Sequence, residues 1–340
     1  MSAQLAHIPT ASAQPQALVA SPVRPSSLTR QRCSRHVTLE PKFGGGCRGV
    51  EVSYLWCGAP DAPTIVVQGG ISASRDVVTP EGEAQGWWQA LVGEDRAIDL
   101  NRYRVLSIDW LAPAELGTAS VSSEDQANAI SALVDALGIG RIAAFIGSSY
   151  GAMVGLAFAK LRPWQLDQLV LLAGAHRAHP MATALRSVQR GIVRLGQNSG
   201  QLDEALSLAR QLAMTTYRGS EEFARRFAGS PELREDRFHF PVEDYLDQAG
   251  RRFVERFDAE RFLALSESID LHDVPPEQVP TPATLIGFPS DRLVPLADLC
   301  ELQRRLAGPA TLEVVESPYG HDGFLKEADR LAPLLRQALL

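Results

Sequence analysis

Residues 147–151, Gly-Ser-Ser-Tyr-Gly, hold the pattern Gly-x-Ser-x-Gly with Ser149 at its centre. An apolar run over 141–147 precedes the pattern, and a segment rich in small residues follows it. At a sharp strand-to-helix turn, such glycines leave room for an exposed serine. The following helix points its N–H groups and dipole toward developing negative charge. This context predicts that Ser149 is a nucleophile and Ser148 only its neighbour; the alternative is a Ser/Gly-rich turn without chemistry.

A serine nucleophile needs a base, and the base needs a carboxylate that orients it. Among the seven histidines, only His321 follows a late predicted strand near the C-terminus. Asp291 lies in a turn directly after the strand predicted before it, over 283–288. Behind a serine elbow on an α/β sheet, the chain order is serine, acid, histidine. We therefore expect a Ser149–Asp291–His321 triad.

An acyl-transferring serine also needs N–H groups that bind the oxyanion. The first expected donor is the backbone N–H of Tyr150, directly after the nucleophile. The second should come from the turn after an earlier strand, where Gly70 and Ile71 follow the β-branched run over 63–70. A tight turn that requires glycine is a compatible explanation of the same residues.

Strand and helix patterns alternate from about residue 48 onward, which predicts a mostly parallel sheet with helices on both faces. The alternation stops between 176 and 275, where helical patterns follow one another without a strand. We therefore expect an α/β core over 38–175 and 276–340, with 176–275 inserted as a helical lid subdomain. Residues 1–37 are rich in Ala, Pro, Ser and Gln and are expected to be a disordered tail, with a targeting segment as the alternative.

Composition narrows the class of protein. The 340 residues carry a formal charge of −7 and no apolar run of membrane-spanning length, so neither a nucleic-acid nor a membrane partner is expected. The four cysteines show neither CxxC pairing nor ligand spacing with histidines. We expect no metal site and a reduced, cytoplasmic protein.

Longer motifs resemble one family, the homoserine O-acyltransferases of methionine biosynthesis, which have the α/β-hydrolase fold. The resemblance covers roughly residues 48–335 and rests on four segments. These are GWWQALVGEDRAIDLNRYRVL, LSLARQLAMTTYR, FPVEDYLDQAGRRFVERFDAERFL and GHDGFL. It implies an α/β-hydrolase fold whose mostly parallel sheet is flanked by helices and carries an inserted helical lid.

The resemblance also implies roles. Nucleophile, acid and base fall on Ser149, Asp291 and His321, and two substrate contacts fall on Arg210 and Asp322. An arginine can clamp the carboxylate of an amino-acid acceptor, and a carboxylate can pair with its ammonium. The implied reaction is ping-pong acyl transfer from acyl-CoA, a co-substrate, to L-homoserine, with no cofactor. A homodimer through the lid is implied as well.

Several alternatives stay open at this stage. The donor is succinyl-CoA or acetyl-CoA; Arg186 and Arg177 near the presumed tunnel favour succinyl-CoA slightly, and Arg186 is the candidate for acyl specificity. L-Serine differs from homoserine by one methylene, so the acceptor stays open too. A carboxylesterase or thioesterase would use the same triad, and a binding module without activity is the last alternative. The departure of the turn at 68–72 from the family pattern leaves the oxyanion donor open.

Overall fold

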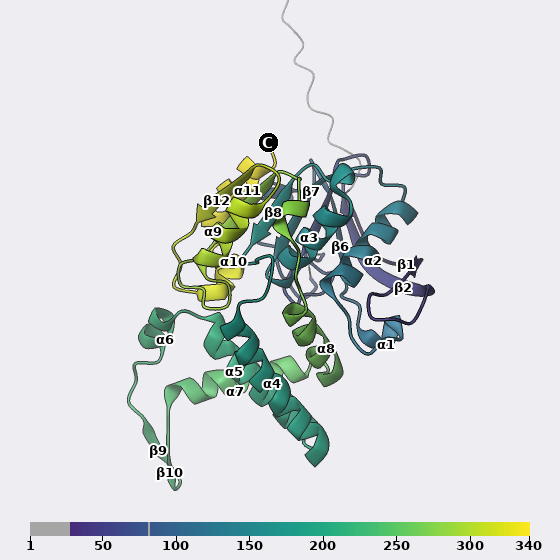
Figure 1. Ribbon diagram of the computed structural model, residues 1–340. Helices are drawn as coiled ribbons and strands as arrows, with labels where there is room; N and C mark the ends of the chain where they lie inside the picture. Colours follow the sequence, from purple (N-terminus) through teal and green to yellow (C-terminus); the bar gives the residue numbers. More distant parts are fainter. Residues whose placement is uncertain (1–27, 81) are drawn as a thin grey trace, which may run out of the picture.

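A computed structural model describes residues 28–80 and 82–340 of the chain. At its centre lies an eight-stranded sheet with the strand order β1-β2-β6-β3-β7-β8-β11-β12 (Figure 1). Only β1 with β2 and β2 with β6 pair antiparallel, and the other neighbours run parallel. The strands are β1 (Thr29–Leu39), β2 (Arg48–Gly58), β3 (Thr64–Gln68), β6 (Arg104–Ile108), β7 (Ile142–Ser148), β8 (Leu169–Leu172), β11 (Ala283–Gly287) and β12 (Ala310–Val314).

Both faces of the sheet are covered, which explains why its central strands are apolar throughout. Along β3, Val66 packs into one core cluster with α2 (Ser123–Ala136), α3 (Tyr150–Leu161) and α9 (Leu296–Arg305). Its neighbours Ile65 and Val67 face the opposite cluster, which α11 (Ala328–Ala338) covers. The predicted α/β-hydrolase architecture is therefore confirmed.

An insert lies between β8 and β11 and forms the lower part of the molecule in Figure 1. Its helices are α4 (Pro180–Ser199), α5 (Leu202–Tyr217), α6 (Ser220–Arg226), α7 (Pro241–Val254) and α8 (Ala259–Asp270). The expectation that no strand interrupts them was wrong. A hairpin of β9 (Glu232–Arg234) and β10 (Arg237–His239) projects away from the core, and its three-residue strands are too short for a readable alternation.

The expected extent of the N-terminal tail was also wrong. Residues 29–37 belong to β1, which pairs with β2 from Thr29 opposite Gly58 to Leu39 opposite Arg48. Most side chains of β1 are polar and at least partly exposed, so its composition is like that of a tail although its backbone is bonded along the sheet edge. The first 27 residues lie outside the described part of the chain.

The remaining elements are short: β4 (Val92–Gly93), β5 (Ile98–Asp99), α1 (Pro113–Leu116), α10 (Gly323–Lys326) and the 3-10 turns Pro163–Gln165, Pro276–Gln278 and Gly320–Asp322. Across the two described ranges, no helix is long and apolar enough to cross a membrane. All four cysteines are free.

Candidate active site

Ser149 stands alone between the last residue of β7 and the first of α3, with φ 54° and ψ −117°. A positive φ strains a residue with a side chain, and such strain is concentrated at functional sites. A Cβ on Gly147 would lie 2.2 Å from the carbonyl oxygen of Gly151, and one on Gly151 would lie 2.3 Å from that of Gln68. Strand, helix and the end of β3 thus approach so closely that only glycine fits on either side of Ser149.

The three predicted triad residues come together. The Oγ of Ser149 lies 2.8 Å from Nε2 of His321, and Nδ1 of His321 lies 2.7 Å from Oδ2 of Asp291. The other carboxylate oxygen of Asp291 accepts from the backbone N–H groups of Leu293 and Val294 at 2.8 and 3.0 Å. An ionised carboxylate only accepts hydrogen bonds, so Nδ1 carries the proton and Nε2 is free to accept the serine proton.

The pKa of His321 is shifted by opposing causes. Burial lowers it, but the charge and hydrogen bond of Asp291 raise it, with a further contribution from Asp322. The cation of Arg186 acts against them. The net result is a pKa above the ordinary histidine value, which suits a base that must hold a proton during the reaction.

The neighbouring Ser148 does not compete for the role of nucleophile. Its side chain is buried, and its hydroxyl oxygen has no hydrogen-bond partner among the described residues. Ser149, by contrast, opens into a cavity of about 420 Å³.

The predicted oxyanion donors surround the serine. Gly70 faces Ser149 so closely that a Cβ there would lie 3.9 Å from Oγ. Its carbonyl accepts from Nε1 of Trp110 and from the N–H of Ala73, both at 3.0 Å. Since C=O and N–H point oppositely in a trans peptide, these bonds also orient the N–H of Ile71. Within residues 28–80 and 82–340, the backbone N–H groups of Gly70, Ile71 and Tyr150 donate no hydrogen bond.

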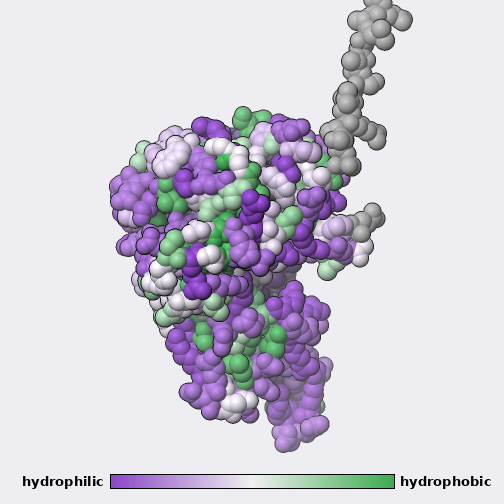
Figure 2. Space-filling model, turned by 90° about the vertical axis from the view of Figure 1, so that its right-hand side faces the viewer, coloured by the Kyte–Doolittle hydropathy of each residue, from purple (hydrophilic) through white to green (hydrophobic). Residues whose placement is uncertain are grey.

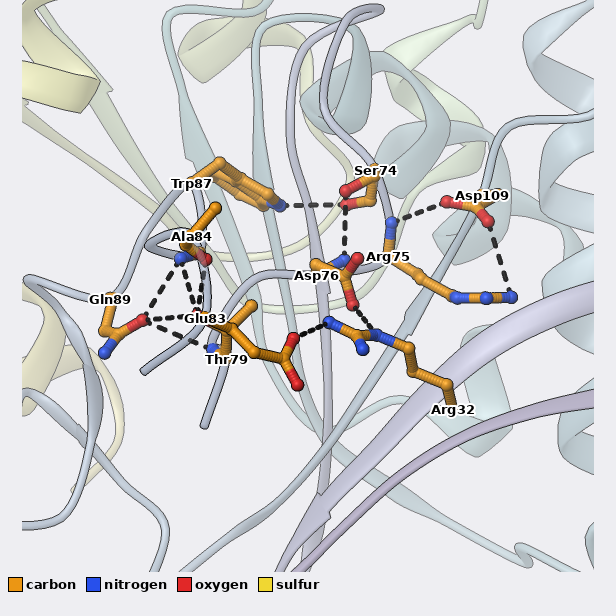
Figure 3. A network of polar contacts seen from close by, with 11 residues as sticks. Arg32, Ser74, Arg75, Asp76, Thr79, Glu83, Ala84, Trp87, Gln89 and Asp109 are labelled. Carbon is orange, nitrogen blue, oxygen red and sulfur yellow. Dashed lines mark hydrogen bonds and ion pairs between the residues drawn. The ribbon is translucent and has the colours of Figure 1, made fainter. Parts of the chain in front are cut away.

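A polar network holds the loop after Gly70 from outside (Figure 3). The indole N–H of Trp87 donates to the carbonyl of Ser74 at 3.0 Å, and the backbone N–H of Arg75 donates to Asp109 at 2.7 Å. Arg32 of β1 reaches Asp76 of the same loop at 2.7 Å. The first strand therefore helps to position the loop that carries the proposed oxyanion donors.

Arg210 of α5 lines the same cavity as Ser149. Its guanidinium carbon lies 5.2 Å from the ring centre of Tyr217 and 4.8 Å from that of Phe253. Over the whole described part of the chain, no carboxylate forms an ion pair with it. Two aromatic faces thus hold a cation that is free to bind an anion.

Asp322 also lines the cavity, but it already has a partner that the sequence did not suggest. Its Oδ2 lies 2.9 Å from Nε of Arg218, the residue that caps α5. Burial raises the pKa of Asp322, against the opposing charges of Arg218, His321 and Arg210. The motif TTYR at the end of α5 was the available signal for Arg218 and for Tyr217, whose ring centre lies 6.0 Å from that of His321.

Arg186 lines the cavity as expected, yet it is not a free cation. It donates to Oδ1 of Asp270 through Nε at 2.9 Å and Nη2 at 2.5 Å, while Arg190 donates to Oδ2 at 2.6 Å. Burial disfavours the charged carboxylate, but the two arginines and Thr183 outweigh it, so the pKa of Asp270 is lowered. Two guanidinium groups around one carboxylate leave a net positive charge at the wall that Arg186 lines, although Arg190 and Asp270 do not themselves line the cavity. Arg177 also lines the cavity, but it is largely exposed and pairs with Glu301 at 3.6 Å.

A second buried serine–histidine contact lies elsewhere. The Oγ of Ser123 is 2.7 Å from Nδ1 of His272, but neither residue lines the cavity. Burial and the nearby His176 lower the pKa of His272 to about 3. This pair joins α2 to the end of the insert and is structural. Within the described ranges, no group of three or more His, Cys, Asp or Glu could hold a metal.

Comparison with known proteins agrees with this fold. A family model described as alpha/beta hydrolase fold matches residues 63–328. The homoserine O-succinyltransferase of Xanthomonas campestris pv. campestris is 46% identical over 303 residues, which are 88% of this chain and 81% of that protein. The chain belongs to the homoserine O-acyltransferase family. It is therefore an acyltransferase.

Other members of the family differ in the substrates that their names state. The serine O-succinyltransferase of Stenotrophomonas maltophilia is 33% identical, over 87% of this chain and 93% of its own length. The homoserine O-acetyltransferase of Moorella thermoacetica is 32% identical, over 76% and 80%. Among solved structures, esterase E22 covers 92% of this chain and 100% of its own with a TM-score of 0.83, at 18% identity. That likeness supports the fold alone.

Proposed function

We propose that this acyltransferase moves a succinyl group from succinyl-CoA, through Ser149, to the hydroxyl of L-homoserine, in methionine biosynthesis. The observation that carries the proposal is the opposite pair Arg210 and Asp322 in the cavity of Ser149. A guanidinium and a carboxylate match the two charges of an amino acid, and an esterase needs neither. The succinyltransferase relative supports the choice.

Acylation is the first half of the proposed reaction. Nε2 of His321 takes the proton of Ser149, whose Oγ attacks the thioester carbonyl. The N–H groups of Tyr150 and of Gly70 or Ile71 bind the oxyanion. The carbon–sulfur bond then breaks, CoA leaves as a thiol with the proton from His321, and the acyl group stays on Ser149.

Transfer is the second half. The acceptor carboxylate binds Arg210, and its ammonium binds Asp322. His321 removes the proton of the acceptor hydroxyl, whose oxygen attacks the acyl-Ser149 carbonyl; collapse releases the O-acyl product and returns the proton to Ser149. The insert narrows the cavity and limits water, which would otherwise hydrolyse the acyl-enzyme.

We infer the donor from Arg186, which lines the cavity and shares Asp270 with Arg190, so that this group carries a net positive charge. A succinyl group carries a distal carboxylate, whereas an acetyl group carries no charge. The charge of Arg186 lowers the pKa of His321, so Arg186 acts electrostatically on the catalytic base. A distal carboxylate on this wall would complete the charge balance of the cluster.

We further propose that the reaction needs no cofactor besides acyl-CoA, because the triad and backbone donors supply nucleophile, base and oxyanion binding. A cytoplasmic location is also proposed, and the four free thiols support it.

A homodimer through the insert is proposed as well. Met181, Val188 and Leu195 recur every seven residues on α4 and are 61%, 56% and 70% exposed. A seven-residue apolar repeat is the pattern of a helix that packs against another helix. Figure 2 shows hydrophobic patches among hydrophilic residues over the insert, in the lower part of the view. A second copy, meeting the same stripe about a twofold axis, would cover it.

One experiment tests donor, acceptor and reaction type together. The protein is incubated with succinyl-CoA or acetyl-CoA, each with homoserine, with serine or without acceptor, and CoA release and product mass are followed. We expect O-succinylhomoserine and a succinyl adduct on Ser149, neither of which Ser149→Ala should form. Formation of O-succinylserine would show that the acceptor is serine rather than homoserine. CoA release at a rate that no amino acid changes would show that the reaction is hydrolysis rather than transfer.

A further inference from the structure

Arg218 is a buried cation that the proposed reaction does not use directly. It lies between two carboxylates, with Nε 2.9 Å from Oδ2 of Asp322 and Nη1 3.3 Å from Oε1 of Glu222. The three side chains are 11%, 12% and 8% exposed, so water screens their charges little. The chain of alternating charges joins the end of α5 and the start of α6 to the turn of His321.

The backbone around Arg218 packs closely against the turn that carries His321. The N–H of Gly219 donates to the carbonyl of Pro318 at 3.2 Å. Gly320 has φ 58°, and a Cβ there would lie 2.9 Å from the carbonyl carbon of Arg218 and from the nitrogen of Gly219. Because the two segments fit without space, the position of Arg218 fixes that of Asp322.

The contact of Arg218 with Asp322 is an ion pair rather than a directed hydrogen bond, because Nε has no aligned hydrogen-bond acceptor. Its distance is 2.9 Å, from Nε to Oδ2. Among the described residues, no hydrogen bond is donated to the Asp322 carboxylate, which lines the cavity. The carboxylate is thus held by a charge and can still accept hydrogen bonds from a ligand.

The charge of Asp322 depends on its neighbours. Burial favours the neutral acid, and the cations that act against it are Arg218 first, then His321 when protonated, Arg210 and Lys326. Arg218 itself is balanced on its other side by Glu222 of α6. Arg218 is therefore the main cation that holds a negative charge at the base of the cavity.

We propose that Arg218 is a positioning residue for the amino-acid acceptor: its ion pair holds the Asp322 carboxylate in place at the cavity, where the carboxylate binds the acceptor's ammonium group. This inference rests on the proposed function. Acyl-enzyme formation does not involve the acceptor, so only the second half of the reaction should depend on Arg218.

The test compares Arg218→Met and Arg218→Lys with Arg226→Met. Arg226 contacts the same Glu222 at 3.6 Å but is half exposed and does not contact Asp322, so it is the matched control. In Arg218→Met, we expect the KM for the acceptor to rise at least about tenfold near neutral pH and to fall again as the pH rises. Arg218→Lys should restore the wild-type pH profile, and Arg226→Met should leave the KM unchanged.

Two further measurements separate the outcomes. Succinyl-enzyme formation without acceptor, followed by intact mass, should keep its rate in Arg218→Met. In an Asp322→Asn background, Arg218→Met should cause no additional rise in the acceptor KM, since the carboxylate that Arg218 holds is gone.

An unchanged acceptor KM and pH profile in Arg218→Met, or an equal loss of acylation, would overturn the inference. If Arg218→Met does not fold, Arg218→Gln takes its place: it must leave acylation unchanged and raise the acceptor KM, and Arg218→Lys must again restore the wild-type pH profile. A wild-type protein without any acyl adduct would instead refute the proposed function.

Discussion

The phenol oxygen of Tyr150 lies 2.6 Å from Oγ of Ser268, so the residue that follows Ser149 is bonded to α8 of the insert. Both side chains are almost fully buried, and the ring of Tyr150 packs edge-on against Trp110 at 4.9 Å. Trp110 in turn donates to the carbonyl of Gly70. One contact chain thus links the insert to both proposed oxyanion donors.

Tyr150→Phe should therefore weaken both stability and acylation. It leaves the buried hydroxyl of Ser268 unpaired, which costs about 1–3 kcal/mol. We expect a lower Tm and slower CoA release, measured by thermal unfolding and a single-turnover assay. Ser268→Ala removes the same bond from the other side. If the loss of this hydrogen bond is the cause, the Tm and the rate of CoA release of the double variant should be little lower than those of either single variant.

The pH dependence of acylation should follow His321. Only the neutral imidazole can take the proton of Ser149, and its pKa is raised above the ordinary histidine value. Activity should thus rise with pH through a limb that lies above the pH at which an ordinary histidine titrates. This limb should appear in kcat/KM for the acyl-CoA, which reports the free enzyme.

Asp291→Asn should shift this limb to lower pH, because burial then acts without the opposing carboxylate. The maximal rate should also fall by about 10⁴-fold, since the imidazole loses its orientation. Asp298 lines the cavity but makes no contact with His321 among the described residues, so Asp298→Asn is the control. An unshifted limb in Asp291→Asn would refute the assignment to His321.

Arg210→Met should separate acceptor binding from acylation. A hydrogen bond to a charged group is worth about 1.5–3 kcal/mol, so the KM for homoserine should rise by about 10- to 150-fold. The rate of acyl-enzyme formation should stay within a few-fold of wild type. Equal losses in both half-reactions would mean that Arg210 supports the cavity rather than the acceptor.

Arg186→Leu should change donor preference. Asp270 keeps Arg190 as a partner in this variant, so the wall loses its net positive charge without an unpaired carboxylate. We expect kcat/KM for succinyl-CoA to fall by about 10-fold or more, and that for acetyl-CoA to stay similar. Arg194, exposed on the same helix, gives the control variant Arg194→Leu.

Val188→Glu should disrupt the proposed homodimer. A charge in the exposed apolar stripe of α4 cannot be paired against its own copy, so sedimentation should show monomers. Gln197→Glu adds the same charge to the exposed surface of α4 outside the stripe and should leave the assembly intact. A wild-type protein that sediments as a monomer would remove this proposal.

The turn that carries Ser149 and the order of the core elements could both be predicted from local sequence patterns. Gly147, Ser149 and Gly151 predict a turn that only those residue types can form, and Asp291 and His321 stand after two strands whose parallel pairing brings their ends together. Such patterns span only a few residues and have strong steric causes, so they can be recognised in the sequence. The lid was equally readable from its helical periodicity, apart from the hairpin at 232–239.

The pairing of charged side chains, by contrast, could be seen only in the folded chain. Arg186 and Arg210 are both helix arginines in the sequence, yet one is bound by Asp270, 84 positions away, and the other stays free between two rings. Likewise, β1 has a tail-like composition, and its strand exists because β2 supplies the backbone partners. Ion pairing and strand pairing depend on distances between segments far apart in the chain, and no local pattern encodes those distances.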